Sequence, residues 1–188
     1  IEDISLMRTL PNMTVINPAD AKEAEAAVLA AIDYQGPVYI RLGRAETKDI
    51  HDDSYHFEWG KAEVLRQGSD VTIFATGIMT AKALDAAETL AKQGVQAEVI
   101  NVHTIKPLDE ETVIASAKKT GKVVTAEEHS IIGGLGSAVA EVLARQCPTK
   151  QAFVGVQDSF GESGSPDDLL EKYGLTTEAI VKAAVGLQ

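Results

Sequence analysis

Hydrophobic and polar positions follow two different periods along this chain. Short apolar runs rich in β-branched residues predict strands at residues 13–18, 37–42, 70–77, 97–104, 122–128 and 152–157. Most of them are separated by stretches with apolar residues at helical spacing, at residues 21–33, 81–93, 108–121, 135–146 and 176–185. Because strands alternate with helices, the pattern predicts an α/β fold built on a parallel sheet with right-handed crossovers.

Several helix ends carry local signals that agree with this pattern. Asp20 precedes the helix predicted at 21–33 and could cap it, and Gly94 follows the helix at 81–93 as a C-terminal cap would. The helix at 108–121 begins with acidic residues and ends with lysines and a glycine, as the helix dipole favours.

The segment at 56–75, HFEWGKAEVLRQGSDVTIFA, departs from the alternation. It has two strand-like halves joined by QGSD, which is a turn signal, and so predicts an antiparallel hairpin that leads into the first parallel strand. The C-terminal part of the chain should therefore contain a mostly parallel five-stranded sheet with one antiparallel strand and helices on both faces.

A polar stretch without periodicity, AETKDIHDDSYH, covers residues 45–56. We interpret residues 48–55 as an interdomain linker between residues 1–47 and a domain at 56–188. The first piece offers two strands and two helices, which is too little for an independent α/β core, so we expect it to be the end of a larger domain.

Composition narrows the possible partners. The formal net charge is -11 and 45% of the residues are apolar. An acidic chain repels phosphate backbones and anionic lipid, so we expect no nucleic acid, no membrane and a cytoplasmic location. Cys147 is the single cysteine, which excludes an intrachain disulfide and a thiolate metal cluster and favours an inert, partly buried thiol. The four histidines show no metal-ligand spacing.

The stretch EEHSIIGGLGSAVAE, residues 127–141, places a glycine-rich turn between a predicted strand and a predicted helix. Such turns often bind phosphate, but here Val139 stands where a dinucleotide fingerprint has its third glycine. The alternative is that Gly133, Gly134 and Gly136 allow a tight turn and close packing of the helix on the sheet. This second interpretation is favoured, and it predicts that the turn serves the fold and an interface and does not bind a cofactor.

The histidines and the loop at 160–166 offer weaker candidates. His129 could be a general base, or it could interact with neighbouring carboxylates at a domain or subunit interface, which the lack of a nearby nucleophile favours. We expect His51 and His56 to be solvated in the linker and His103 to make local hydrogen bonds. The loop FGESGSP is expected to be a shaped connection before the last helix, although it could also bind phosphate.

Arg41 and Arg44 stand three residues apart where the strand predicted at 37–42 ends. Ligands of open α/β sheets lie beyond the carboxyl ends of strands, and a guanidinium there can bind a phosphate through two hydrogen bonds. Spacing alone leaves both ligand binding and a salt-bridge role open for each arginine.

Taken in order, six motifs resemble the C-terminal portion of transketolases, in the form of the separately encoded C-terminal section. They are IEDISLMRTLPNMTVINPADAKEA, GPVYIRLGR, WGKAEVL, HTIKPLD, EEHSIIGGLGSAVAE and FGESGSPDDLLEKYGLTTEAI. The resemblance covers nearly the whole chain. It implies that residues 1–47 are the end of a pyrimidine-binding domain, and that residues 56–188 are a transketolase C-terminal domain.

The resemblance also implies a function: transfer of a two-carbon ketol unit between sugar phosphates, with thiamine diphosphate and Mg²⁺ or Ca²⁺. The family's cofactor-activating glutamate, aromatic clamp, metal site and active-site histidine would all precede Ile1. The chain alone would then be inactive and bind no cofactor, and its partners would be an N-terminal transketolase section and a second copy in a homodimer.

One functional residue is implied within the chain. Arg44 matches the arginine that contacts the substrate phosphate, whereas Arg41 has no such counterpart. The family usually places a proline soon after that arginine, and here Ala45 and Glu46 follow, which puts the shape of the loop in question. No catalytic, cofactor-binding or metal-binding residue is implied.

Three alternatives stay open. Two are related enzymes, namely 1-deoxy-D-xylulose-5-phosphate synthase and the beta subunit of a 2-oxoacid dehydrogenase. The third, of another class, is a non-catalytic dimerisation or regulatory module. The C-terminal SGSPDDLLEKYGLT and the arginine of RLGR favour transketolase.

Overall fold

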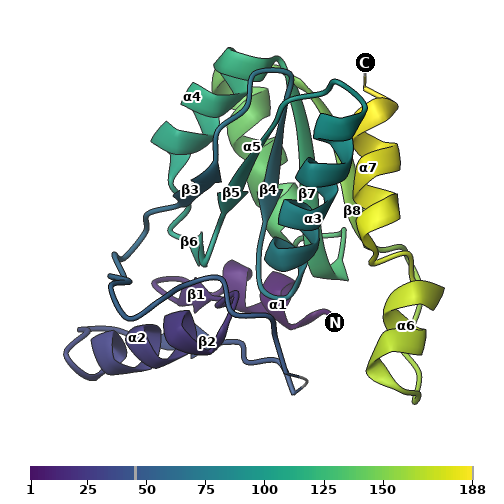
Figure 1. Cartoon of the computed structure of the whole chain (residues 1–188). Helices are drawn as coiled ribbons and strands as arrows, with labels where there is room; N and C mark the ends of the chain where they lie inside the picture. The colour runs from purple at the N-terminus through teal and green to yellow at the C-terminus, as the bar shows by residue number, and fades with distance from the viewer. Residues whose placement is uncertain (45, 188) are drawn as a thin grey trace.

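The computed structural model describes residues 1–44 and 46–187, so Ala45 lies outside the described residues. The larger of its two sheets has the order β3-β5-β4-β7-β8 (Figure 1). Its members are β3 (Glu63–Arg66), β4 (Val71–Ala75), β5 (Ala97–Asn101), β7 (Lys122–Ser130) and β8 (Lys150–Val156). The last four are parallel to one another, and β3 is antiparallel to β5. This confirms the predicted mostly parallel sheet with one antiparallel strand.

The predicted hairpin at 56–75 is wrong. β3 does not pair with β4, because β5 and β7 occupy both edges of β4. The turn between them instead crosses β5, where the backbone N–H groups of Ser69 and Asp70 both donate to Gln96 O. Central β4 is fully buried whereas edge strand β3 is half-exposed. A turn signal indicates that the chain reverses, but not which strand fills the gap.

Helices cover both faces of this sheet, as predicted. On one face α3 (Met79–Lys92) and α7 (Thr177–Val185) pack together, and on the other face α4 (Glu110–Thr120) lies beside α5 (Leu135–Gln146). The short helix α6 (Pro166–Lys172) projects from the edge near β8 (Figure 1). The predicted caps are also present. Asp20 Oδ1 accepts from Glu23 N at 2.9 Å, and both Gly94 and Gly121 have positive φ.

The smaller sheet joins the first 47 residues to a strand from the middle of the chain. Its order is β2-β1-β6, with β1 (Thr14–Ile16), β2 (Val38–Ile40) and β6 (Thr104–Lys106). β1 and β2 are parallel, and β6 pairs antiparallel with β1. With α1 (Asp3–Thr9) and α2 (Ala21–Ile32), residues 1–47 supply two strands and two helices. They obtain their third strand from a segment far along the sequence.

The segment predicted as a linker is anchored on both sides. The side chain of His51 is only 3% exposed, with Nδ1 3.0 Å from Asp20 Oδ2 and Nε2 2.9 Å from Glu63 Oε2. The prediction that His51 is solvated is therefore wrong, because two carboxylates from either side enclose its ring. The prediction is confirmed for His56, which is exposed.

Two further local predictions are confirmed. His103 is buried and its Nδ1 lies 2.8 Å from the hydroxyl of Thr104. Cys147 is a free, partly buried thiol.

Candidate functional site

In the larger sheet the strand order reverses between β4 and β7, which is where doubly wound folds usually bind ligands. Here that crevice contains the end of β1 instead. Thr76 Oγ1 and Gly77 N both donate to Asn17 O, at 3.1 and 3.3 Å. The Asn17 side chain lies so close to Gly77 that a Cβ there would be 2.7 Å from its amide nitrogen. Residues 1–47 thus dock at the crevice of the larger sheet, where a hollow of about 500 Å³ lined by Asn17, Gly77 and Glu128 remains.

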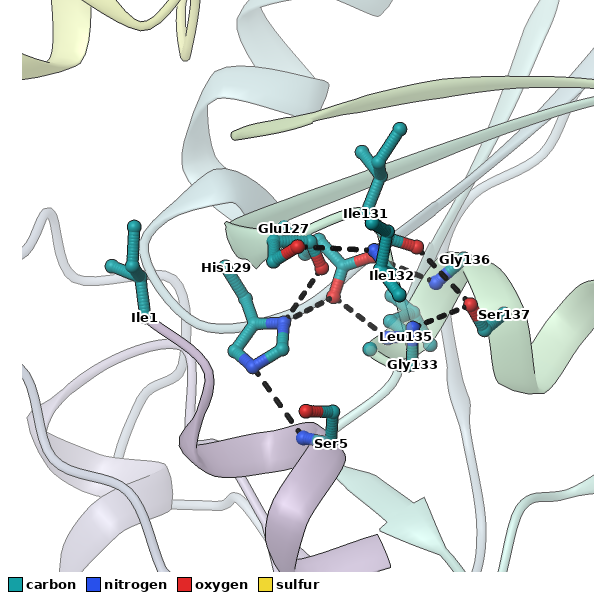
Figure 2. Close-up of polar contacts among 12 residues, drawn as sticks. Ile1, Ser5, Glu127, His129, Ile131, Ile132, Gly133, Leu135, Gly136 and Ser137 are labelled. Carbon is teal, nitrogen blue, oxygen red and sulfur yellow. Dashed lines mark hydrogen bonds and ion pairs between the residues drawn. The ribbon is translucent and has the colours of Figure 1, made fainter. Parts of the chain in front are cut away.

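The glycine-rich turn already contains a carboxyl group. Glu127 comes from the end of β7, and its carboxylate accepts N–H bonds from Leu135 at 2.7 Å and Gly136 at 2.8 Å, at the start of α5 (Figure 2). The side chain of Glu127 is 1% exposed. A carboxylate in this position satisfies the helix N-terminus as a bound phosphate would.

Two glycines permit this arrangement. A Cβ at Gly134 would overlap Glu127 Oε2 and lie 2.7 Å from His129 Nδ1. Gly133 has a φ of +79°, and a Cβ there would lie 2.5 Å from Ser5 Cβ. The turn is therefore a feature of close packing, as the favoured interpretation predicts, and its geometry does not fit a diphosphate.

His129 links this turn to α1. Its Nε2 accepts from Ser5 N at 3.4 Å and its Nδ1 lies 2.7 Å from Ser130 O, so the neutral Nδ1–H tautomer satisfies both contacts (Figure 2). Burial lowers the pKa of His129. Burial also raises the pKa of Glu127 to about 7, against the two N–H bonds and the positive charge of Arg8. Both ring nitrogens are thus engaged by backbone groups, and Glu127 Oε2 lies 3.7 Å from Nδ1, so His129 lies beside a carboxylate where α1 meets the glycine-rich turn.

The two candidate arginines have different surroundings. Arg41 is 16% exposed and ion-paired on two sides, with Nε 3.0 Å from Asp3 Oδ2 and Nη1 3.0 Å from Glu128 Oε2. Burial lowers the pKa of Arg41, but the two carboxylates raise it by more. Arg41 is thus the salt-bridge residue of the pair.

Arg44 is exposed, and the contacts of the described residues include no hydrogen bond or ion pair to its side chain. It lines a hollow of about 480 Å³ at the end of β2. Tyr39, Arg41, Asp3 and Glu128 line the same hollow. Arg44 is therefore available to an anionic ligand in a way that Arg41 is not.

Glu23, His51 and Glu63 present ligand atoms within 4.8 Å of one another, which is close enough for a metal ion. The hydrogen bonds explain the group without one, because Glu23 Oε1 accepts from Tyr55 and Asn101. Burial lowers the pKa of His51, but the bonds to Glu63 and Asp20 outweigh it and raise the value to about 9. Both ring nitrogens of His51 are also engaged, by Asp20 and Glu63, so the described contacts account for this cluster as an ion-pair network.

Comparison with known families decides the identity. The family model described as transketolase, C-terminal domain, matches residues 60–180, and the one described as transketolase, pyrimidine binding domain, matches residues 1–49. This chain belongs to the transketolase family.

Individual transketolases are similar over nearly the whole chain. A 6-deoxy-6-sulfo-D-fructose transketolase subunit from Clostridium sp. strain MSTE9 is 56% identical, covering 98% of this chain and 57% of that protein. A subunit of an apulose-4-phosphate transketolase from Phocaeicola vulgatus is 38% identical, covering 98% of this chain and 59% of that protein. The chain thus spans somewhat more than half the length of these relatives.

The solved structure of a split-gene transketolase, described as an inactive beta4 tetramer, superposes with a TM-score of 0.97. It is 53% identical, and the match covers 100% of this chain and 61% of that one. No helix among the described residues is long and apolar enough to cross a membrane.

Sequence reasoning missed the roles of two residues in this region, Glu127 and Glu128. The sequence presents Glu127 only as a neighbour of His129, although a carboxylate shortly before a glycine-rich helix start is the signal that it could fill the anion position. Glu128 has no predictable partner, because Arg41 lies 87 residues earlier and no local pattern connects them.

Proposed function

We propose that this chain is the C-terminal part of a transketolase that transfers a two-carbon ketol unit between sugar phosphates and depends on thiamine diphosphate. In this proposal the chain is inactive alone and works with an N-terminal transketolase section in a homodimeric assembly. The family membership supports it, as does the fraction of each relative that the chain spans.

An exposed apolar face supports the need for further protein. On α2, Val28, Leu29 and Ile32 are 45%, 58% and 74% exposed. Exposed apolar side chains at helical spacing are typical of a surface that another part of an assembly covers.

Arg44 carries the substrate proposal. It stands at the carboxyl end of a parallel strand, it lines an open hollow, and its guanidinium is uncommitted among the described contacts, whereas Arg41 is neutralised by two carboxylates. We propose that Arg44 binds the terminal anionic group of the sugar.

Among the described residues, the glycine-rich turn does not fit the diphosphate of the cofactor. The glycine-rich turn is the place where a helix N-terminus could receive a diphosphate, and Glu127 fills it. In the proposal, thiamine diphosphate and its Mg²⁺ or Ca²⁺ are therefore held by the N-terminal section.

The anion at Arg44 could be a phosphate or a sulfonate. The name of one relative specifies a sulfonated fructose and the name of the other a sugar phosphate. Both groups present three oxygens to a guanidinium, and a phosphate monoester carries the larger negative charge. We propose phosphate as the anion, and a sulfonated sugar serves as the comparison substrate in the test.

The test is Arg44→Ala in enzyme assembled from this chain and its N-terminal section. Loss of one charge-assisted contact should lower kcat/KM for phosphorylated acceptors about 10- to 100-fold, mainly through KM. The phosphate is remote from the bond that breaks, so unphosphorylated acceptors should keep most of their rate. Arg44→Lys should restore activity in part, because it keeps the charge without the planar fork.

Arg145→Ala is the matched control, because Arg145 is 61% exposed and, among the described contacts, pairs with Glu110 on α4 and the Glu141 carbonyl on α5. Arg145→Ala should leave kcat/KM unchanged for both kinds of acceptor. Equal losses on both kinds of acceptor after Arg44→Ala would make Arg44 a structural residue and remove the site. A larger loss for the sulfonated sugar than for the phosphorylated one would identify sulfonate as the natural anion.

A further inference from the structure

We infer that Glu128 and Arg41 are positioning residues through which the C-terminal domain fixes the strand end that carries Arg44. This inference rests on the proposed function, because it concerns how Arg44 is presented to the anion.

Three elements meet at Arg41. The backbone N–H of Arg41 donates to Ile16 O at 2.8 Å, which extends the pairing of β2 with β1 by one residue. Nε reaches Asp3 in α1 and Nη1 reaches Glu128 in β7, both at 3.0 Å. Tyr39 also donates to the same Asp3 oxygen at 2.8 Å. The end of β2 is thereby attached to the first helix and to the C-terminal domain.

Arg41 is the last residue before Arg44 that is held in this way. Leu42 is 59% exposed, and the flexible Gly43 separates it from Arg44. No described helix or strand includes residues 42–44. Arg41 is therefore the fixed point from which this short segment presents Arg44, and its position limits where the Arg44 guanidinium can lie.

The two carboxylates would otherwise oppose an anionic ligand. Asp3 and Glu128 line the same hollow as Arg44. Burial raises the pKa of Asp3, but the Tyr39 hydrogen bond and the charge of Arg41 outweigh burial and leave the pKa below its usual value. Without positioning, removal of either carboxylate should simply strengthen the binding of a phosphate.

Because of this repulsion, the two possible roles of Glu128 predict opposite changes in KM. If Glu128 acts only as a nearby negative charge, Glu128→Ala in the assembled enzyme should lower KM for phosphorylated acceptors. If Glu128 positions the end of β2, the same substitution should raise that KM about 3- to 10-fold, as expected for a partly exposed charge-assisted contact. In that case kcat and the KM of unphosphorylated acceptors should stay within about two-fold of wild type.

Glu128→Gln keeps the shape and one acceptor oxygen, so it should show a smaller rise in KM than Glu128→Ala. Glu141→Ala is the matched control. Glu141 pairs with Arg8 at 3.1 Å and also joins α1 to the C-terminal domain, but it does not line the hollow at Arg44. A merely structural bond between the two parts would make Glu141→Ala and Glu128→Ala alike, and we expect only Glu128→Ala to raise KM.

Arg44→Ala, measured in parallel, separates the two proposals. If it lowers kcat/KM selectively for phosphorylated acceptors while Glu128→Ala lowers KM or leaves it unchanged, the positioning inference is overturned and the function stands. If Arg44→Ala acts equally on both kinds of acceptor, the anion site fails and the positioning inference fails with it. A selective rise in KM for both Arg44→Ala and Glu128→Ala, with Glu141→Ala unchanged, is the result that we expect.

Discussion

At the scale of single residues, Glu127 determines what residue 134 can be. The φ of Gly134 is -81°, which any residue can adopt, so the glycine is required by contact and not by backbone conformation. We predict that Gly134→Ala lowers the free energy of unfolding by about 1–3 kcal/mol, because Glu127 cannot retreat without losing its two N–H bonds. Denaturant unfolding monitored by circular dichroism would measure this.

Gly161→Ala is the control for this substitution. Its Cβ would meet only Ile1 Cδ1, at an ordinary 3.8 Å. We expect its unfolding midpoint to match that of the wild type. If Gly134→Ala unfolds at the same denaturant concentration as Gly161→Ala, the contact with Glu127 is not rigid and the argument is wrong.

The sequence distinguished Arg44 from Arg41 only through the family resemblance. Both arginines follow the same predicted strand, so their positions in the sequence do not tell them apart. Their surroundings differ because Asp3 and Glu128, which are remote in sequence, both form ion pairs with Arg41. The role of Arg44 stays a prediction. Contacts of this kind depend on tertiary packing, which hydrophobic periodicity does not encode.

At the scale of elements, the linker around His51 holds the two parts of the chain together. Its imidazolium lies between Asp20 at the start of α2 and Glu63 on β3, with Glu23 nearby. The pKa of His51 rises from 6.5 to about 9 in the folded chain. A raised histidine pKa gives stability that is complete below the unfolded value and lost as pH rises through the folded one.

We therefore predict that the chain loses about 1–3 kcal/mol of its free energy of unfolding between pH 6.5 and 9. This energy is less than the full pKa shift would give, because Glu63 is 41% exposed and solvent screens its charge. His51→Gln should remove most of this dependence, as measured by denaturant unfolding at several pH values. His56→Gln, which changes an exposed histidine of the same segment, should preserve it. An equal pH dependence in wild type and His51→Gln would refute the prediction.

Most elements followed from periodicity and end signals, and the failures share one cause. The apolar run at 97–104 predicts one strand, but β5 ends at Asn101 and β6 begins at Thr104 in the other sheet. The predicted hairpin failed because β3 pairs across the sheet with β5. Local pattern indicates a strand, whereas the partner of that strand is decided by packing.

At the scale of the whole molecule, the C-terminal part has a core of its own. Apart from the partly buried Ile1, its two clusters on the faces of the larger sheet draw on residues beyond 60. We predict that a chain beginning at residue 56 folds cooperatively, with a lower melting temperature than the full chain because β6 loses β1 and His129 loses Ser5. Thermal unfolding would measure both properties.

Hydrogen exchange would show which strands lose protection when residues 1–55 are removed. In the shortened chain the amides of Thr104–Lys106 should exchange much faster than in the full chain, while those of β4 should stay protected. Loss of protection throughout β4 would show that the C-terminal part does not fold independently and that the boundary at residue 56 is misplaced.

The pairing of β1 with β6 also has a consequence for synthesis. Val15 pairs with Lys106, which leaves the ribosome 91 residues later. At roughly 5–20 residues per second, β1 is exposed for about 5–20 s before its β6 partner exists. During that interval β1, fully buried in the finished fold, has an open edge and an uncovered apolar surface. Nascent chains stalled before residue 104 should therefore be strong substrates for chaperones, and those stalled well past residue 106 should be released.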